Sequence, residues 1–597
     1  MPVKISDLPA AGSLAETDVV PGVNASTTVK MTLTAIGNLI TRTVTGFLPA
    51  GSGGTAQSVQ ARLRKTVLTS DYDTLANAIT AAASSVLVIN TAITVASNLT
   101  IASTVKLTFA PEGQLTVNSG VTLTINGFIT AAPDQQIFAG TGTLVIAKAT
   151  NPEVWAHWFV GGDMGLKINA ARAAISPGGT IKLLPGTHTV STQIDLSSTT
   201  GVRLIGSGGN QNASNPPGTV LSWSLTTAAN AIKLDGAASI EIAYLGFQTN
   251  NTMTGSFIDT ATTDASDVHI HHCAFIGGTL TKSCIDLDVA LNWTIEECFF
   301  RYCEYHVRFE GSSNNAVNIR KCWFDSTCSV SNIILLGSSI SIDSNVFEST
   351  VKPILTMNGT SNNLGFTNNW AGDAGAVAIT LIDLSQYILT GGLIANNFLA
   401  INHASSICIL FKSANNNTRG VRVTGNHFSG TGTAVHLGAS EACSVEDNYI
   451  NCTIPLEGST GSNNTGPVKW SFKRNSISDT PSGTYTNIGV SLANNAIMPI
   501  APNRGAITGG LKGAGYVNFY ITLDSDGSIQ AIGQFCLLPN APSTAEIRDE
   551  FTNMANAKGT ASSFNVYYDT TDSYSGFKLQ NLSGNAVRVI VDSFSPV

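Results

Sequence analysis

The sequence predicts an all-β protein whose main body is a right-handed parallel β-helix, a solenoid of stacked coils. Three observations predict this fold. Charged residues make up only 12% of the chain, and 56 glycines occur among frequent Thr, Ser, Asn, Val and Ile, a composition that favours short strands joined by turns. At 597 residues the chain is too long for one ordinary core. A short apolar pattern also recurs from residue 202 onward.

The recurring pattern is two apolar positions in alternation, then a small ladder residue, then an apolar ring. Its copies read VHIHHCAF, WTIEECFF, VNIRKCWF, ISIDSNVF, LGFTNNWA, LIANNFL, VRVTGNHF, CSVEDNYI and WSFKRNSI, at intervals of 22 to 29 residues. The period of two predicts a strand in each copy, and each interval is then one coil. Coils should stack about 4.8 Å apart. The inward ladder residues, hydrogen-bonded from coil to coil where they are Asn, are Cys273, Cys298, Cys322, Asn345, Asn369, Asn397, Asn426, Asn448 and Asn475.

The segments before this repeat are less regular. Residues 1–45 are rich in turn-forming residues without a long apolar face, which predicts a small module. Residues 46–70 begin with a Gly/Ser linker and continue into a short helical pattern. The residues on one face of that predicted helix are Val59, Leu63 and Val67. Residues 71–150 alternate with a shorter spacing, which predicts a preliminary β-rich or solenoid section.

The main β-helix is predicted for residues 151–483, where the ladder runs. After that the alternation becomes hairpin-like around the turn DSDG. Residues 484–597 are therefore predicted to form an antiparallel β-sandwich, which would bind sugar or hold subunits together.

Two stretches resemble known families. GTAQSVQARLRKTV resembles the neck segment of bacteriophage tailspike proteins, and the first forty residues resemble their virion-anchoring segments. NPEVWAHWFVGGD followed by INAARAAISPGGTIKLLPGTHTV is similar to the entry of pectate-lyase-like β-helix proteins, where a short helix precedes the first coil. The Asp-rich D-G-x-x-D-D-T run of that family is missing, and only GGDMG is kept. No role of that run is therefore carried over.

The resemblance covers about two-thirds of the chain and implies a phage tailspike of the polysaccharide depolymerase type. Such a protein is a homotrimer, attached to the phage tail or baseplate through its N-terminus. It is assembled in the host cytoplasm and acts at the bacterial cell surface. There it binds and depolymerises a surface polysaccharide (capsule, exopolysaccharide or O-antigen).

Composition excludes several other classes. The mild net charge of −8 argues against nucleic-acid binding, which favours a basic surface. No run of eighteen apolar residues is present, so we expect no membrane insertion, and the opening MPVKISDLP does not resemble a signal peptide. The ten cysteines form no CxxC pair and are expected to be free thiols. We expect no cofactor.

The stretch DVHIHHCAF, Asp267 to Phe275, carries three histidines and a cysteine within five positions, as zinc sites do. Alternation places Cys273 inside with the ladder and His269 and His271 outside. The four side chains cannot then meet at one metal, so we expect no metal site here.

Stacking the copies predicts an outward column in which His271, Glu296, Arg320 and Asp343 lie on four successive coils. The position after the ladder residue should also point outward, and it holds the rings of Phe299, Trp323, Phe398, His427 and Tyr449, with Trp370 in a slightly altered coil. Aromatic rings and charged groups together suit sugar binding. Glu296 and Asp343, two coils and about 9.6 Å apart, could serve an inverting glycosidase. An ordinary cross-strand charge ladder is the structural alternative.

A second pair comes from the next strand. In CIDLDV and, one coil later, VRFEG, Asp286 and Asp288 should point outward with Arg308 and Glu310 stacked on them. Asp288 and Glu310 would then be one strand spacing apart, close to a retaining geometry. Solvated charge at the rim of an interface is the alternative. The later coils IILLG, ILTMN and ICILF are apolar on both faces, so this face is predicted to pack against neighbouring subunits.

Carboxylate-catalysed hydrolysis is the leading activity, with His271, Arg320, Arg308, Phe299, Trp323 and His306 as substrate-binding candidates. Two alternatives remain open. One is a non-enzymatic receptor-binding tail fibre, because the same solenoid supports both functions. The other is a polysaccharide lyase, which needs a His or Tyr base such as His306 or His271 and a cation such as Arg320 or Arg308.

Overall fold

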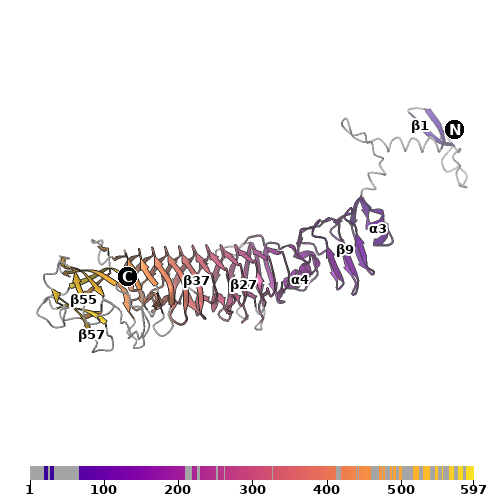
Figure 1. The fold of residues 1–597 in the computed structure, drawn as a ribbon. Coiled ribbons are helices and arrows are strands. Elements are labelled where there is room, and N and C mark those ends of the chain that lie inside the picture. The colour runs from indigo at the N-terminus through magenta and orange to yellow at the C-terminus, as the bar shows by residue number, and fades with distance from the viewer. Residues whose placement is uncertain are drawn as a thin grey trace. The chain divides into compact units, whose positions relative to one another are not determined.

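The computed structural model of the protein is drawn in Figure 1. It describes residues 66–453 in full, apart from 209–217, 225–228, 250–252, 261–262, 326, 349, 412–417 and 437–442. Outside these residues it describes strands and the ladder residue Asn475. The chain divides into two compact units, Met1–Pro152 and Glu153–Val597. No helix in the described part of the chain is both long and apolar enough to cross a membrane.

The first unit contains a short parallel solenoid, which is one of the two forms expected for residues 71–150. Three small parallel sheets form its faces. The first holds β3 (Thr66–Leu68), β4 (Val86–Ile89), β7 (Lys106–Phe109) and β10 (Ile129–Thr130); the second holds β5 (Ala92–Val95), β8 (Gln114–Val117) and β11 (Phe138–Gly140); the third holds β6 (Leu99–Ile101), β9 (Thr122–Ile125) and β12 (Thr143–Ile146).

Only the end of the predicted neck lies within these residues. Val67 is a buried strand residue of β3, not a helical one. The helices described in this unit are the 3-10 helix η2 (Thr69–Asp71) and the α-helix α3 (Leu75–Ala81). The remainder of the predicted helix lies outside the described residues, as does most of residues 1–45. There the described strands are β1 (Val19–Asn24) and β2 (Thr27–Thr32), which pair antiparallel.

The second unit begins with the helix that the pectate-lyase-like resemblance implied, α4 (Met164–Ala174). Asp163 caps it by accepting a hydrogen bond from the backbone N–H of Leu166 at 2.9 Å. The same carboxylate accepts from the hydroxyls of Ser191 and Thr192, which ties the helix start to the end of β15 (Gly186–Val190).

The body of the second unit is a parallel β-solenoid, as predicted (Figure 1). Each coil contributes a first, a second and a third strand, and strands of one kind pair in parallel register from coil to coil. The first strands form a 14-stranded sheet whose main path is β13 (Glu153–Trp155), β14 (Gly179–Lys182), β17 (Val202–Ile205), β20 (Glu241–Ala243), β24 (His269–His271), β28 (Thr294–Glu296), β31 (Asn318–Arg320), β34 (Ser341–Asp343), β37 (Ser361–Thr367), β40 (Leu389–Ala395), β43 (Thr418–Thr424), β46 (Cys443–Glu446) and β48 (Trp470–Lys473).

The second and third strands share one 22-stranded sheet. Its second strands include β18 (Thr219–Trp223), β21 (Leu245–Thr249), β25 (Ala274–Ile276), β29 (Phe299–Arg301), β32 (Trp323–Phe324), β35 (Val346–Thr350), β38 (Trp370–Asp373), β41 (Phe398–Ile401), β44 (His427–Leu437) and β47 (Tyr449–Gly458). Its third strands include β19 (Ile232–Lys233), β22 (Ile258–Thr260), β26 (Ser283–Leu287), β30 (Tyr305–Phe309), β33 (Ser331–Leu335), β36 (Leu355–Met357), β39 (Thr380–Leu384) and β42 (Ile407–Phe411).

The predicted ladder lies inside the solenoid. Each Asn Nδ2 donates to the Oδ1 of the Asn on the next coil, from Asn345 to Asn475, at 2.9 to 3.0 Å. The backbone N–H of Cys322 donates to Asn345, which joins the cysteine column to the ladder. A phenylalanine stack fills the core beside it, with centroids 4.6 to 6.0 Å apart, in the order Phe247, Phe275, Phe300, Phe324, Phe347 and Phe366.

A tight corner precedes the ladder on every coil from β24 to β46. The residue just before the ladder residue has a left-handed backbone, with φ between 52° and 66°. These corner residues are His272, Glu297, Lys321, Ser344, Asn368, Asn396, Gly425 and Asp447. This conformation turns the chain from the first strand into the second within two residues on each of these coils. The outward residues of the first and second strands therefore keep the same relative position from coil to coil.

Residues after 484 form two further sheets, whose strands are paired antiparallel except β56 with β57. The first sheet holds β51 (Ile488–Leu492), β53 (Gly515–Leu523), β54 (Ile529–Leu537), β55 (Ala545–Arg548) and β59 (Val587–Pro596); the second holds β52 (Ile497–Pro499), β56 (Met554–Ala555), β57 (Phe564–Asp569) and β58 (Gly576–Asn581).

Candidate functional site

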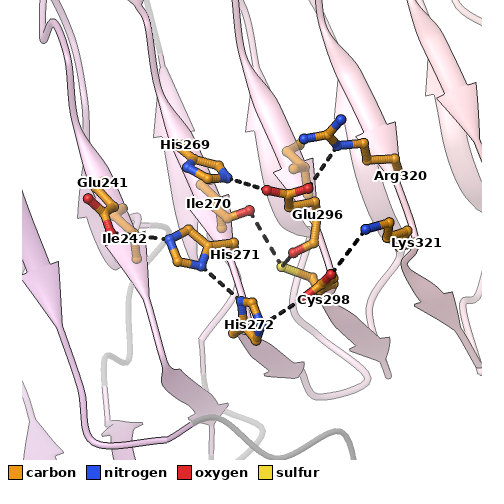
Figure 2. A network of polar contacts seen from close by, with 12 residues as sticks. Glu241, Ile242, His269, Ile270, His271, His272, Glu296, Cys298, Arg320 and Lys321 are labelled. Carbon is orange, nitrogen blue, oxygen red and sulfur yellow. Dashed lines mark hydrogen bonds and ion pairs between the residues drawn. The ribbon is translucent and has the colours of Figure 1, made fainter.

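The first predicted column is present on the outer face of the 14-stranded sheet. His271, Glu296, Arg320 and Asp343 are register partners on β24, β28, β31 and β34. Figure 2 shows how polar contacts connect the first three of these coils. Glu296 accepts from His269 at 2.8 Å on one side and from Arg320 at 2.8 Å on the other. Glu296 is therefore the centre of a cross-strand charge network that joins β24, β28 and β31.

The two adjacent histidines contact each other and two carboxylates. His271 Nε2 contacts Glu241 at 3.2 Å, His272 Nε2 contacts Glu297 at 2.6 Å, and the two Nδ1 atoms lie 2.9 Å apart (Figure 2). Burial lowers the pKa of His271, and the hydrogen bond to Glu241 opposes this shift only in part. Glu241 and His272 therefore fix the orientation of the His271 ring.

The two carboxylates of this column are both held in the ionised state. Burial opposes the charge on Glu296, but hydrogen bonds from His269 and Arg320 outweigh it and lower its pKa. Burial likewise opposes the charge on Asp343, and hydrogen bonds from Thr367, Asn368 and Ser344 lower its pKa overall. A glycosidase needs one carboxyl that keeps its proton. This pair lacks one, and Arg320 lies between its members.

Cys273 does not share a surface with the histidines. Its thiol is 2% exposed and donates to the backbone carbonyls of Ile242 at 3.6 Å and His271 at 3.3 Å. His269 and His271 leave the strand on the other side. The sulfur and the imidazoles therefore cannot ligate one ion, as the alternation predicted.

The aromatic position that follows the ladder points outward, with one correction. Phe299 and Trp323 are register partners, and Trp323 is 40% exposed. Phe299 is only 4% exposed and packs its ring against Trp323 at 6.1 Å. The outward direction of the Phe299 side chain therefore did not make its ring accessible to solvent. The prediction that Phe299 contacts a substrate is wrong for this conformation.

The second predicted pair lies where β26 and β30 end. Asp286 is the register partner of Arg308, and the N–H of Glu310 donates to the carbonyl of Leu287 at 2.9 Å, which places Asp288 opposite Glu310. The spacing between neighbouring strands puts the backbones of Asp288 and Glu310 about 4.8 Å apart. Arg308 contacts both Glu310 and Asp286, and Lys282 lies 3.7 Å from Glu310.

The electrostatics of this second site differ from those of the first column. Burial and the charges of Glu310 and Asp286 raise the pKa of Asp288. Glu310 instead has two cationic neighbours, Arg308 and Lys282. One carboxyl that favours its proton thus lies beside one that is ion-paired, the split that acid and nucleophile roles require. Asp286 was expected on the surface, but its side chain is only 4% exposed. Its carboxylate forms an ion pair with Arg308 at 3.1 Å.

Asp259 belongs to this site and was not predicted from the sequence. It is the register partner of Asp286 on the preceding coil and is 9% exposed. Burial and the charges of Asp286 and Asp235 raise its pKa to about 7. Ile258 and Asp259 repeat Ile285 and Asp286 one coil earlier, so aligning the third strands would have found it.

His306 does not lie on a surface turn as predicted. It is 0% exposed within β30 and lies beside the stacked rings of Phe300 and Phe324, with centroids 6.0 and 5.9 Å away. Its Nδ1 pairs with Asn332 at 3.0 Å. The prediction that His306 binds substrate or acts as a lyase base is therefore wrong, because its ring is enclosed in the core.

Burial of His306 predicts acid sensitivity. Burial lowers its pKa to about 3, below the ordinary value near 6.5, so the folded state binds fewer protons than the unfolded state. The contribution to stability is present above pH 6.5 and is lost as the pH falls toward 3. Between pH 7 and 5 the loss should be about 2 kcal/mol. The unfolding free energy, measured with guanidinium at pH 7 and pH 5, should differ less between the two pH values in His306→Phe than in the wild type.

A matched control is His403→Gln, which changes a half-buried histidine in a loop. It should leave the pH dependence of the unfolding free energy as it is in the wild type. Equal pH dependence in His306→Phe and the wild type would contradict the assignment of this loss to His306.

Comparison with known proteins gives similarity in fold. No protein-family model and no curated protein matches the sequence. Similar solved structures are DFA-IIIase from Arthrobacter chlorophenolicus A6 without its lid (15% identity, 54% of this chain and 94% of that chain, TM-score 0.41), Geobacillus virus E2 ORF18 (12%, 72% and 84%, 0.33) and the Acinetobacter phage vB_ApiP_P1 tailspike protein (11%, 73% and 86%, 0.28). At these values the similarity concerns the type of fold and carries no argument about activity. The parallel β-solenoid predicted from the sequence is seen in the structure itself.

Proposed function

We propose that this protein binds a bacterial surface polysaccharide and cleaves it by glycosidic hydrolysis, with Asp288 and Glu310 as the reacting carboxyls. The observation that carries the proposal is their pairing across adjacent strands with opposite electrostatic surroundings. Asp288 would protonate the leaving oxygen while Glu310 attacks the anomeric carbon. Water deprotonated by Asp288 would then hydrolyse the bond between the sugar and Glu310, which restores both residues. Carboxyl groups about 5 Å apart correspond to retention of configuration, and the backbones of this pair are separated by about that distance.

Other residues are assigned supporting roles. Arg308 forms an ion pair with Glu310 and would orient it. On the neighbouring face, the His271 ring would bind sugar hydroxyls and the Arg320 guanidinium would bind hydroxyls or acidic groups, while the exposed Trp323 would stack on a sugar ring. Glu296 and Asp343 fit the structural role of a charge ladder better than catalysis, because neither retains a proton.

The biological setting is proposed from the sequence resemblance. Residues 46–70 resemble a tailspike neck, which supports a place on the phage tail, attachment through the N-terminus and assembly as a homotrimer. The half-buried Ile334 and Leu410 on the third strands support a covered face in such a trimer.

The direct test uses the full chain and a panel of purified capsular polysaccharides, exopolysaccharides and O-antigens. Hydrolysis should release new reducing ends from one of them without ultraviolet absorbance from a new double bond. Unsaturated product would replace hydrolysis with elimination. A polysaccharide that is bound but never shortened would leave a non-enzymatic receptor-binding fibre.

A further inference from the structure

Four aromatic rings form an exposed stripe on the second strands, away from the third strands that carry Asp288 and Glu310. Trp370, Phe398, His427 and Tyr449 are successive register partners on β38, β41, β44 and β47. Trp370 is 42% and Tyr449 40% exposed, and the other two are half-buried. Centroid separations of 6.4, 4.8 and 4.7 Å make the stripe continuous. We call these four residues the aromatic platform.

A small residue lies beneath the first ring of the platform. A Cβ on Gly372 would meet the Trp370 indole at 3.3 Å, so that ring covers the glycine. The positions two residues beyond Phe398 and His427 are also small, Ala400 and Ser429. The Trp370 and Phe398 rings are parallel, with an interplanar angle of 1°, whereas His427 is tilted by 59° from Phe398 and Tyr449 by 70° from His427. The platform therefore offers two parallel rings followed by two tilted ones.

Polar groups border the platform on both sides. The exposed corner residues Asn368, Asn396 and Asp447 precede Trp370, Phe398 and Tyr449 by two positions, and the carboxylate of Asp447 disfavours an acidic ligand there. The exposed Asn451 lies two positions after Tyr449. Burial lowers the pKa of His427, so this ring is neutral at pH 7 and no platform residue carries a full charge. Apolar ring faces with amides at their edges suit the faces and hydroxyls of sugar rings.

The width of the platform identifies the kind of ligand. A stable protein interface buries about 800 Å² on each partner, which a stripe one residue wide cannot supply. Three coil spacings make the stripe about 14 Å long, which suits a single extended polymer. We infer that the aromatic platform is a non-catalytic binding surface for an uncharged stretch of a linear polysaccharide that runs along the solenoid axis. This inference rests on the proposed polysaccharide ligand, but not on its cleavage.

The test measures equilibrium binding of the polysaccharides named above to the full chain, with Trp370→Ala, Tyr449→Ala and the double variant. Each ring should contribute roughly 3- to 10-fold in affinity for the long polymer. Cleavage of a short oligosaccharide should stay within about twofold, because the platform lies on other strands. The control Tyr387→Ala removes an equally exposed ring (39%) outside the platform and should bind like the wild type.

Each other outcome separates the two proposals. Unchanged affinity in the double variant overturns the platform while leaving hydrolysis intact. Binding without cleavage in the wild type overturns hydrolysis, and the platform is then still judged by the affinity of the variants. A change in oligomeric state in Trp370→Ala, measured by light scattering, overturns the platform in favour of a subunit contact. Absence of binding to every polysaccharide overturns both.

Discussion

The Asp288→Asn variant should cleave polysaccharide about 10²- to 10⁴-fold more slowly than the wild type. Asparagine cannot protonate the leaving oxygen, although it has nearly the same shape as the acid. Glu310→Gln should lose activity to a similar extent, because the ion-paired carboxylate disappears. The wild-type rate should also fall as the pH rises through the raised pKa of Asp288, since only the protonated acid is active. Initial rates of reducing-end formation measure all three effects.

The matched controls come from the first column. Glu296→Gln and Asp343→Asn change carboxylates of the same chemistry on the neighbouring sheet, and each should keep activity within about threefold. If Glu296→Gln abolished cleavage while Asp288→Asn did not, the catalytic pair would lie on the first strands. The lowered pKa of Glu296 would then have to be overcome by the substrate itself.

The Asn397→Leu variant should lose on the order of 5 kcal/mol of folding stability. Asn397 Oδ1 accepts both the backbone N–H and the side-chain amide of Asn369, and its own amide donates to Phe366 and Asn426. Leucine offers no partner, so several buried polar groups would be left without hydrogen bonds at about 1–3 kcal/mol each. Guanidinium unfolding followed by circular dichroism gives the difference.

Asn396→Gly is the control for this loss. It removes the adjacent, exposed amide at a position whose φ of 56° glycine adopts without strain. Its effect should stay below about 1 kcal/mol. A loss of similar size in both variants would show that the corner, not the buried ladder, determines stability at this coil.

Alternation along a strand and register between coils were enough to predict the solenoid and its first column. The Asn ladder and the column of His271, Glu296, Arg320 and Asp343 needed only the period of two and the interval between copies. His306 was misplaced because the chain bends between the second and third strands, where simple alternation no longer gives the direction of a side chain. Phe299 was misplaced because exposure depends on neighbours as well as on direction.

The balance of charge at the candidate site could not be predicted from spacing. Asp288 and Asp259 have raised pKa values because burial and nearby carboxylates act together, and both depend on three-dimensional packing. Glu296 and Glu310 are the same residue type in the sequence. In the structure, Glu296 accepts hydrogen bonds from His269 and Arg320, which gives it a structural role. The residue types were visible in the sequence, whereas their division into structural and reactive carboxyls required the fold.

The left-handed corner also determines where this protein can vary. From β24 to β46, two residues separate the end of each first strand from the start of the second, as between Asp343 and Val346. An insertion there would displace the ladder residue and break the stack. The other two corners differ in length from coil to coil, so changes of loop length can accumulate there while the core stays in register. Related sequences should therefore differ in the length of the loops at those two edges and keep this edge at constant length.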